Sequence, residues 1–340
     1  MTIQEEDMLE DLKHPLIQAP MAGVSTPALA AAVCEAGGLG FVALGALDAT
    51  GARAAIEQTR ALTGRPFGVN LFCHAPARRD HLREGRWLAR LAPEFARHGA
   101  TPPEALHEIY QSFRVNEAML ALLLDARPAF VSFHFGLPNP QQIAALRDTG
   151  ARLLATATSE AEGQAILDAG LDGIVAQGWQ AGGHRGIFDP DAPDERLETL
   201  PLLGRLRPLG LPLIAAGGIM TREDARAATR AGAVAVQCGT AFLRAPEAAN
   251  PAAHREALSS GRTVMTRAIS GRAARCVENL FTAIDGEEAP DYPVAYDAGK
   301  ALNAAALAQG ETGYGAFWAG TGAAQAVARP AAETVAAISP

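Results

Sequence analysis

The feature of this sequence that most constrains its fold is a regular alternation of short apolar runs with longer, alanine-rich stretches of helical pattern. Such an alternation is typical of βα units, in which each strand is followed by a helix that leads to the next parallel strand. Eight runs have the character of buried strands, and eight strands close a barrel. They cover residues 15–20 (PLIQAP), 39–44 (LGFVAL), 66–72 (PFGVNLF), 130–136 (FVSFHFG), 152–158 (RLLATAT), 173–178 (GIVAQG), 212–218 (PLIAAGG) and 233–239 (AVAVQCG).

Several of the intervening stretches carry the start and stop signals of helices. Thr26, Ser159 and Thr221 each stand before an alanine-rich helical pattern, and each pattern ends at a glycine. Serine and threonine side chains accept hydrogen bonds from the first N–H groups of a helix, and glycine favours its end. The sequence therefore predicts an α/β protein with a (β/α)8 TIM barrel.

Two segments interrupt the barrel pattern. The interval from Phe72 to Phe130 is too long for one crossover helix, and we expect helices over 78–98 and 103–124 there. We predict that 1–73 and 125–249 form the barrel, whereas 74–124 and 250–340 form a smaller, mainly helical capping domain over its mouth. The tail from Pro330 is rich in alanine and proline, and we expect it to be poorly ordered.

Charge and composition argue against several classes of partner. The net charge is −8 and the basic residues do not cluster, so we expect no nucleic-acid partner. No apolar run reaches the roughly 18 residues of a membrane span, and the acidic start, MTIQEEDMLEDLKH, lacks the pattern of a signal peptide. We expect a cytoplasmic protein without a membrane partner. The cysteines and histidines show no metal-ligand spacing, so we expect no metal site.

Glycines after the last two predicted strands point to a phosphate site. In TIM barrels the loops after strands seven and eight often bind phosphate through backbone N–H groups, which glycine leaves accessible. Gly217 and Gly218 follow the seventh run, and Gly239 and Thr240 follow the eighth. Tight turns explain either loop alone, but the presence of both at these strands favours phosphate binding.

Two amide side chains bear on which phosphate compound binds. No Walker A motif is present, whereas flavin mononucleotide (FMN) uses phosphate donors together with amides along the edge of its ring. Asn70 and Gln177 stand at strand ends and suit that role. The equal alternative for each is a buried amide that satisfies loop backbone.

The stretch AQGWQAGGHRG, residues 176–186, supplies a candidate catalytic group. Gly182 and Gly183 remove side chains where a planar ring can lie against the backbone. His184 then becomes a candidate base, since an ordinary histidine pKa of about 6.5 suits proton abstraction near neutral pH. Arg185 is equally a binding group for a substrate anion or a solvated side chain. On the fourth strand, His134 either donates a hydrogen bond to substrate or is a core histidine bonded to backbone.

Several motifs together resemble the nitronate monooxygenases, formerly called 2-nitropropane dioxygenases. The likeness extends over nearly the whole chain, and FHFG, GGHRG and the late Trp-Ala-Gly resemble class I in particular. The motifs are PLIQAPMAGVSTPALAAAVCEAGGLGFVALG, VSFHFGLP, AQGWQAGGHRG, PLIAAGGIMTREDARAATRAGAVAVQCGTAFL and GAFWAGTGA.

The resemblance implies an FMN-dependent barrel that oxidises alkyl nitronates, propionate 3-nitronate above all, with O2 to a carbonyl compound and nitrite. It assigns His184 and His134 to the active site, and Tyr296 and Lys300 to the part of the C-terminal region that closes the pocket on an anionic substrate. It implies FMN contacts at Met21, Ala22, Gly23, Asn70, Gln177, Gly182, Gly218, Gln237, Cys238, Gly239 and Thr240. One departure is Gln180, where the family usually has glutamate.

Two alternative functions share these glycine loops. The first is an FMN-dependent reductase of enoyl thioesters or quinones that uses NADH or NADPH. The second is a flavin-free isomerase or lyase that binds a phosphate compound on the same barrel. The second class normally carries a strand-end lysine or paired acids, which the strand ends of this chain lack. The monooxygenase remains the preferred prediction because the glycine loop carries the basic HRG and the earlier strand carries FHFG.

Overall fold

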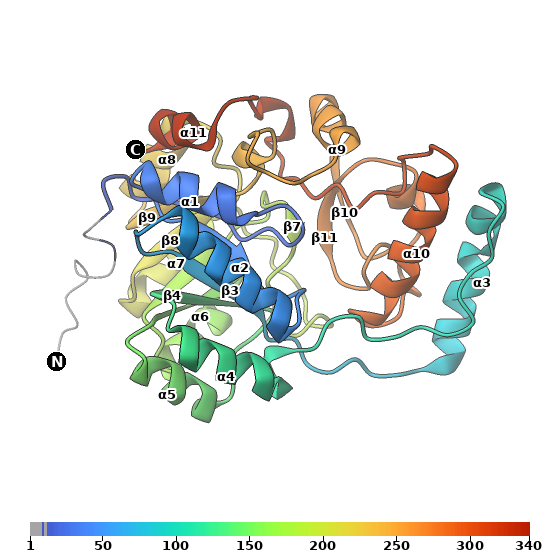
Figure 1. Cartoon of the computed structure of the whole chain (residues 1–340), viewed down its shortest axis with the longest axis horizontal. Helices are drawn as coiled ribbons and strands as arrows, with labels where there is room; N and C mark the ends of the chain where they lie inside the picture. The colour runs from blue at the N-terminus through green and yellow to red at the C-terminus, as the bar shows by residue number, and fades with distance from the viewer. Residues whose placement is uncertain (1–8, 10–11) are drawn as a thin grey trace.

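The structure, a computed structural model, describes Leu9 and residues 12–340, so most of the acidic start in which we expected no signal peptide lies outside the described residues. Eight parallel strands form one sheet in the order β1-β9-β8-β6-β5-β4-β3-β2 (Figure 1). All eight strands predicted from the sequence are present. They are β1 (Leu16–Gln18), β2 (Phe41–Ala43), β3 (Gly68–Phe72), β4 (Phe130–His134), β5 (Arg152–Ala157), β6 (Gly173–Gln177), β8 (Leu213–Ala216) and β9 (Ala235–Cys238).

The sheet closes on itself between β1 and the residues just before β2. Ile17 forms a parallel bridge with Leu39, and the N–H of Gln18 donates to the carbonyl of Leu39 at 2.9 Å. A closed barrel leaves no open sheet edge. Its interior is filled by large side chains, since Ile17, Phe41 and Ile214 belong to one buried cluster. This confirms the predicted (β/α)8 TIM barrel.

Helices surround the barrel on the outside (Figure 1). Thr26, Ser159 and Thr221 cap three of them as predicted, because each side chain accepts a hydrogen bond from a backbone N–H in the first helical turn. Such caps satisfy donors that have no partner within the helix. The helices of the barrel are α1 (Pro27–Glu35), α2 (Ala49–Leu62), α4 (Glu117–Ala126), α5 (Pro140–Asp148), α6 (Glu160–Asp168), α7 (Thr199–Leu206) and α8 (Arg222–Arg230).

The interval between β3 and β4 contains one long projecting helix, α3 (His81–Arg97), close to the first helix predicted there. The second prediction, 103–124, is wrong in its first half. Residues 101–112 form no helix, and α4 begins only at Glu117, beyond the 3-10 turn Phe113–Val115. Asn116 caps α4 through a hydrogen bond from the N–H of Met119, at 2.9 Å. Pro102 and Pro103 lack backbone N–H groups, which disfavours a helix across them.

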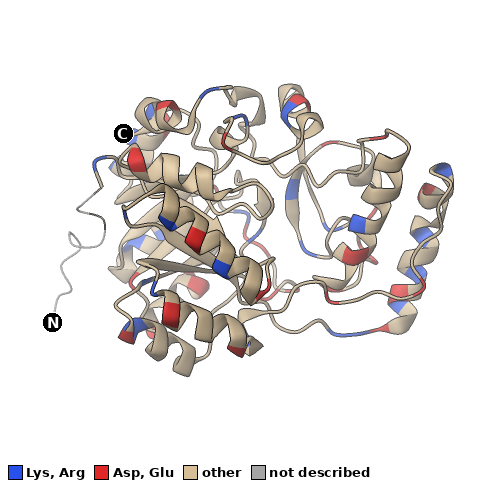
Figure 2. Cartoon of the chain, viewed as in Figure 1, with Lys and Arg blue, Asp and Glu red and all other residues tan. Residues whose placement is uncertain are grey.

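Helix α3 and the residues just before it are tied to the C-terminal region by ion pairs. Arg78 Nε lies 2.7 Å from Asp291, and Arg86 Nε lies 2.9 Å from Glu288. Both connections join the insertion to the loop before α10 (Val294–Ala308), and α3 and α10 lie side by side in Figure 1. Figure 2 shows acidic and basic residues interspersed along α3 and elsewhere on the molecule. The division of the chain into barrel and capping domain remains our proposal, supported by these contacts.

The C-terminal region is helical but also contains a small antiparallel sheet that the sequence analysis missed. Its strand order is β10-β11-β7, with β10 (Thr263–Thr266), β11 (Ala274–Val277) and β7 (Gly183–His184). Strand β7 belongs to the glycine loop after β6, so this sheet joins that loop to the C-terminal region. The register pairs His184 with Ala274.

The end of the chain is ordered, and the expectation of a poorly ordered tail from Pro330 is wrong. Residues Ala331–Ile338 form α11, which packs against α1. Val335 and Ile338 are buried, so apolar burial stabilises this helix although a proline stands on each side of it, at Pro330 and Pro340. The remaining short helix, α9 (Ala252–Ala257), lies between the barrel and the small sheet in sequence. None of the described helices is both long enough and apolar enough to span a bilayer.

Candidate functional site

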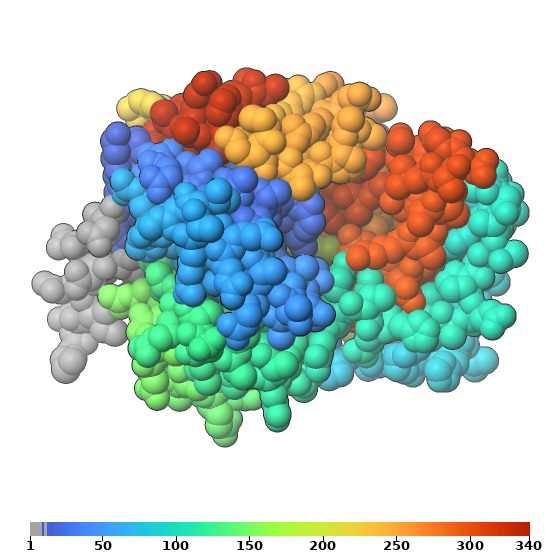
Figure 3. All heavy atoms as spheres, viewed as in Figure 1, coloured from blue at the N-terminus to red at the C-terminus, as the bar shows by residue number. Residues whose placement is uncertain are grey.

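A cavity of about 820 Å³ lies at the C-terminal ends of the barrel strands, beneath the C-terminal region. Its walls come from the loops after β1, β3, β4, β6, β8 and β9 and from one face of α10. In the space-filling view a recess lies between the N-terminal half of the barrel and α10 (Figure 3). Catalytic groups of TIM barrels are found at this end. The cavity collects most of the site residues predicted from the sequence.

At one end of the cavity, backbone N–H groups are available to an anion. Those of Gly218, Gly239 and Thr240 have no acceptor among the described residues. Gly218 has a φ of +72°, a conformation that glycine adopts without strain. The hydroxyl of Thr240 accepts a hydrogen bond from Gly320 N–H at 2.9 Å, so its own proton is left for another acceptor. Gly217 completes this glycine turn, and the whole arrangement fits a phosphate group.

The loop after β1 and the ends of β3 and β9 form another part of the cavity wall. Met21, Ala22 and Gly23 line the cavity, and a Cβ at Gly23 would meet nothing within 4 Å. Asn70 donates from Nδ2 to the hydroxyl of Ser132 at 2.9 Å, and Oδ1 has no partner among the described residues. Gln237 and Cys238, at the end of β9, also line this wall. This partly polar wall fits the ring of a flavin.

The glycine loop after β6 is held by Gln177. This side chain donates from Nε2 to the carbonyl of His184 at 2.9 Å and accepts from the N–H of Gly186 at 2.8 Å. The amide therefore satisfies loop backbone, which is the second of its two sequence-based interpretations, although Gln177 also lines the cavity. Gly182 packs so closely against the chain around Gly320 that a Cβ there would lie 2.4 Å from the N of Gly320. Gly183 has a φ of +73°.

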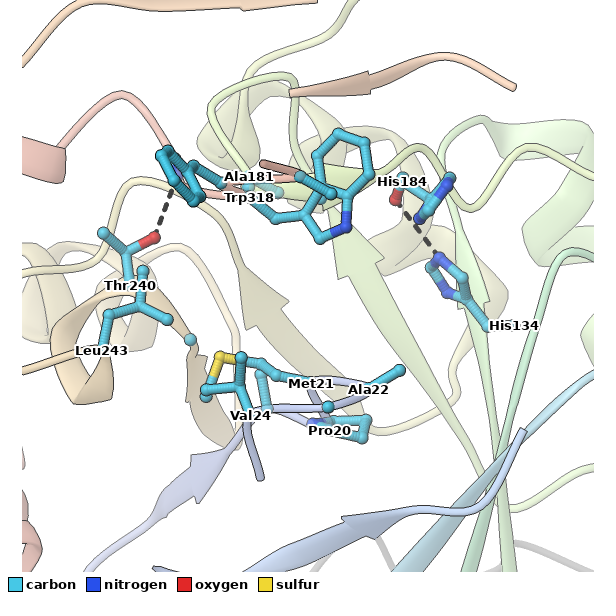
Figure 4. A pocket seen from close by; sticks show the side chains of 18 of the residues that line it. Pro20, Met21, Ala22, Val24, His134, Ala181, His184, Thr240, Leu243 and Trp318 are labelled. Carbon is cyan, nitrogen blue, oxygen red and sulfur yellow. Dashed lines mark hydrogen bonds between the residues drawn. The ribbon is translucent and has the colours of Figure 1, made fainter. Parts of the chain in front are cut away.

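His134 lines the cavity and supports the same loop through its ring nitrogens, and its predicted hydrogen bond to the substrate stays a prediction. Its Nε2 lies 3.2 Å from the carbonyl of His184 (Figure 4). Its Nδ1 lies 2.9 Å from the hydroxyl of Thr156. A carbonyl only accepts hydrogen bonds, so Nε2 carries the proton and Nδ1 accepts from Thr156. Both ring nitrogens of His134 are thus occupied.

His184 faces the cavity at the end opposite the phosphate loops. Its ring centre lies 5.0 Å from that of Trp318 and 5.4 Å from that of Tyr292. Its Nε2 lies 2.9 Å from the hydroxyl of Ser270. Its Nδ1 has no partner among the described residues and is not buried by protein. The free nitrogen therefore opens into the cavity.

Both histidines of the site are neutral near pH 7. Burial, together with the nearby His134 and the guanidinium of Arg272, lowers the pKa of His184 to about 3. Burial likewise lowers the pKa of His134 to about 4. Desolvation disfavours the charged imidazolium, and a neighbouring positive charge acts in the same direction. The ordinary pKa assumed for His184 from the sequence is therefore too high.

Arg185 does not line the cavity, and its predicted contact with a substrate anion is a further correction. The side chain is 1% exposed and forms a two-pronged ion pair with Asp194, with N–O distances of 2.8 and 2.9 Å. A third hydrogen bond, at 2.8 Å, goes to the carbonyl of Gln177. Side chains alternate across a strand, so the residue after His184 points to the other face of β7. Arg185 anchors the loop.

Two predicted residues of α10, Tyr296 and Lys300, lie along the cavity. They are four residues apart, which places them on the same helix face. The ammonium of Lys300 lies 4.9 Å from the ring centre of Tyr110 and 5.5 Å from that of Tyr296. This is a positive group at the cavity wall with no carboxylate partner among the described ion pairs.

Several residues near His184 were not predicted individually. Trp318 lies within GAFWAGTGA, so the motif located it without assigning a role. Tyr110, Tyr292 and Ser270 stand in segments without regular periodicity, and nothing in the sequence places them beside the glycine loop. Tyr110, Tyr292 and Trp318 line the cavity, whereas Ser270 reaches it only through His184.

Gln180, the departure from the usual glutamate, anchors the glycine loop to α7. Its Oε1 accepts from the N–H and the hydroxyl of Thr199, at 3.0 and 3.1 Å. Thr199 is the first residue of α7, and the N–H groups at a helix start need acceptors. An amide oxygen meets this need without a charge. Gln180 does not line the cavity.

Comparison with known proteins agrees with this geometry and confirms the family resemblance. The profile of the nitronate monooxygenases matches residues 6–339. A nitronate monooxygenase of Paraburkholderia phytofirmans is 55% identical over 333 residues, which cover 96% of this chain and 91% of the relative. One of Pseudomonas aeruginosa is 50% identical over 330 residues, covering 95% and 94%.

Solved structures show the same relationship. The nitroalkane oxidase from Streptomyces ansochromogenes superposes with a TM-score of 0.90 at 40% identity, covering 97% of this chain and 96% of that one. FabK from Thermotoga maritima has a TM-score of 0.74 at 27% identity, covering 98% and 93%. The chain therefore belongs to the nitronate monooxygenase family of oxidoreductase enzymes.

Proposed function

We propose that this protein binds FMN and oxidises alkyl nitronates with O2 to a carbonyl compound and nitrite. Family membership supports nitronate oxidation. The observation that carries the proposal is the cavity itself, which joins unpartnered backbone N–H groups at one end to the free nitrogen of His184 at the other. One compound with a phosphate and a redox-active ring fits that span.

FMN would be held mainly by backbone. The N–H groups of Gly218, Gly239 and Thr240 would bind its phosphate, and the glycines of the β6 loop would leave room for its ring. When bound, FMN accepts electrons from the substrate and returns them to O2, and the protein supplies orientation and electrostatics. Met21, Ala22, Gly23, Asn70, Gln177, Gly182, Gly183, Gly217, Gln237 and Cys238 are the remaining residues proposed at this cofactor site.

The substrate anion would lie near Lys300 and Tyr296. A nitronate carries a negative charge, and the ammonium of Lys300 is a positive group of this wall. Propionate 3-nitronate has a carboxylate as well as the nitronate group, so two anionic ends need partners. Tyr296 and Lys300 are four residues apart, which corresponds to about 6 Å along the axis of α10. We therefore propose that Lys300 pairs with the carboxylate while the nitronate carbon faces His184.

The environment of His184 favours a nitronate over a neutral nitroalkane. A neutral nitroalkane must first lose its α-proton to a base, whereas a nitronate is already deprotonated. Because burial lowers the pKa of His184 to about 3, this imidazole is a weak base. We expect turnover of neutral nitroalkanes to be much slower than turnover of nitronates.

The proposal is tested by aerobic turnover of the purified holoenzyme. Oxygen consumption and nitrite release are measured with propionate 3-nitronate, with ethyl nitronate and with nitroethane. We expect nitrite from both nitronates, with nitroethane far slower. If a preparation that contains FMN released no nitrite from propionate 3-nitronate and none from ethyl nitronate, the proposal would be contradicted.

A further inference from the structure

The hydroxyl of Ser270 lies between the ring of His184 and a backbone carbonyl. Its Oγ is 2.9 Å from Nε2 of His184 and 3.2 Å from the carbonyl oxygen of Arg272. Ser270 is 1% exposed, so solvent does not compete for either contact. The segment 269–273 stands directly before β11, whose first residue pairs with His184 across the small sheet.

The donors and acceptors along these contacts determine the tautomer of His184. A serine hydroxyl has a single hydrogen and can also accept, whereas a carbonyl can only accept. With the Ser270 hydroxyl donating to the carbonyl of Arg272, its oxygen accepts from His184. The proton of the neutral imidazole is then on Nε2, and Nδ1 carries a lone pair.

The remaining contacts of His184 hold that lone pair toward the cavity. The backbone carbonyl of His184 accepts from both Gln177 and His134, so the main chain at this position is fixed from two sides. The ring packs against Trp318 and Tyr292, with centres 5.0 and 5.4 Å away. No described side chain donates to Nδ1, so a bound substrate is the partner left to it.

We propose that Ser270 is a positioning residue that fixes the Nε2–H form of His184 and thereby makes Nδ1 the proton acceptor of the site. The inference rests on the proposed function, because the substrate is taken to be a nitro compound or its nitronate. With a neutral nitroalkane, the α-proton passes to Nδ1, and the electron pair of the broken C–H bond moves into the nitro group to give the nitronate. With a nitronate no proton is transferred.

This assignment predicts a loss confined to one substrate. Ser270→Ala removes the acceptor for Nε2–H and lets the proton occupy either nitrogen. The rate with nitroethane, divided by the rate with ethyl nitronate, should fall about tenfold, which is the effect of one hydrogen bond worth about 1.4 kcal/mol. Ser270→Thr keeps a hydroxyl and should restore much of that ratio.

A second serine provides a matched control. Ser339 lies 2.9 Å from Nδ1 of His14, so it also forms a histidine–serine pair, but neither residue lines the cavity. Ser339→Ala should leave the ratio of the two rates unchanged. A fall of equal size in Ser339→Ala would overturn the inference, since the effect would then reflect stability.

The tautomer is observed directly by NMR of the FMN-bound protein labelled with ¹⁵N in histidine, with the His184 signals assigned by their loss in His184→Asn. We expect a protonated Nε2 and an unprotonated Nδ1 in the wild type, and a mixture in Ser270→Ala. A protonated Nδ1 in the wild type would overturn the inference even if nitronates are turned over. An Nε2–H signal in a protein that does not oxidise nitronates would support the assignment while contradicting the proposed function.

Discussion

The guanidinium of Arg272 lies 4.3 Å from the centre of the Phe135 ring. Phe135 in turn packs against His184, with ring centres 5.6 Å apart. Arg272 is 3% exposed, has no carboxylate partner among the described ion pairs, and keeps an unpartnered Nε. Burial lowers its pKa to about 10. A buried charge without a direct ion-pair partner is costly, and its field acts strongly on neighbouring groups.

Removing this charge should make His184 easier to protonate. The field of Arg272 lowers the pKa of His184, of His134 and of His74. We expect Arg272→Met, which roughly keeps the side-chain length, to raise the pKa of His184. An NMR titration of the histidines measures it. Arg275→Met is the control, because Arg275 is also buried but does not act on His184. An unchanged pKa in Arg272→Met would contradict the role assigned to this charge.

Buried histidines should make the fold sensitive to mild acid. The pKa of His254 is lowered to about 4, chiefly by burial, against about 6.5 in the unfolded chain. Between those values the unfolded state binds more protons, so the free energy of unfolding falls as pH falls below 6.5. We expect His254 to account for about 2 kcal/mol of that loss between pH 7 and pH 5.

Urea unfolding at several pH values measures the contribution of His254 to the free energy of unfolding. His254→Phe preserves the stacking on Phe317, whose ring lies 5.1 Å away and nearly parallel, and removes the titration. Its free energy of unfolding should therefore decline less steeply between pH 6 and pH 5, by about 1.2 kcal/mol. The same decline in wild type and variant would show that His254 is not held neutral.

The glycine turn after β8 should be needed for FMN binding. Gly218 has a φ of +72°, and a Cβ there would lie 3.1 Å from the Cβ of Gln180. Gly210 has nearly the same φ, +71°, but open space around it and no contact with the cavity. Alanine at either position costs about 1 kcal/mol of backbone strain. We expect Gly218→Ala to lower the ratio of FMN to protein, measured from absorbance, and Gly210→Ala to leave it unchanged. Full occupancy in Gly218→Ala would show that the phosphate site is misplaced.

Lys300 should discriminate between nitronates by their charge. Its side chain is exposed at the cavity wall, where an ion pair is worth about 1 kcal/mol or less. We expect Lys300→Met to lower kcat/KM about fivefold for propionate 3-nitronate, and less for ethyl nitronate, which has no carboxylate. Steady-state kinetics measure kcat/KM for both nitronates at two salt concentrations. Added salt should weaken the ion pair between Lys300 and the substrate carboxylate in the wild type, whereas Lys300→Met has no such pair to screen. Equal losses for the two substrates would remove Lys300 from carboxylate recognition.

The barrel was predictable because its signals are local. Each strand is a short apolar run, and Thr26, Ser159 and Thr221 mark helix starts through hydrogen bonds within one turn. The small sheet was not predictable, since it pairs residues as distant in sequence as His184 and Ala274. Its strands are short and belong to segments without a regular apolar pattern.

The candidate site, like the fold, could be predicted only where its signals are local in the sequence. Glycines and strand-end residues were placed at the cavity correctly, because their position follows from the strands. The protein partners of Arg185 and His134 were not predictable, because only the fold brings them near. Asp194 holds Arg185 away from the cavity, and Thr156 occupies a nitrogen of His134. Ser270 was missed for the same reason.

Anaerobic reduction of the FMN-bound holoenzyme is the most direct test of nitronate oxidation. The protein is mixed separately with propionate 3-nitronate and with NADH or NADPH, and the visible flavin spectrum is followed. The account predicts rapid loss of the oxidised flavin spectrum with the nitronate and little change with either nicotinamide. Rapid bleaching by a nicotinamide, with none by the nitronate, would contradict it and identify the protein as a reductase.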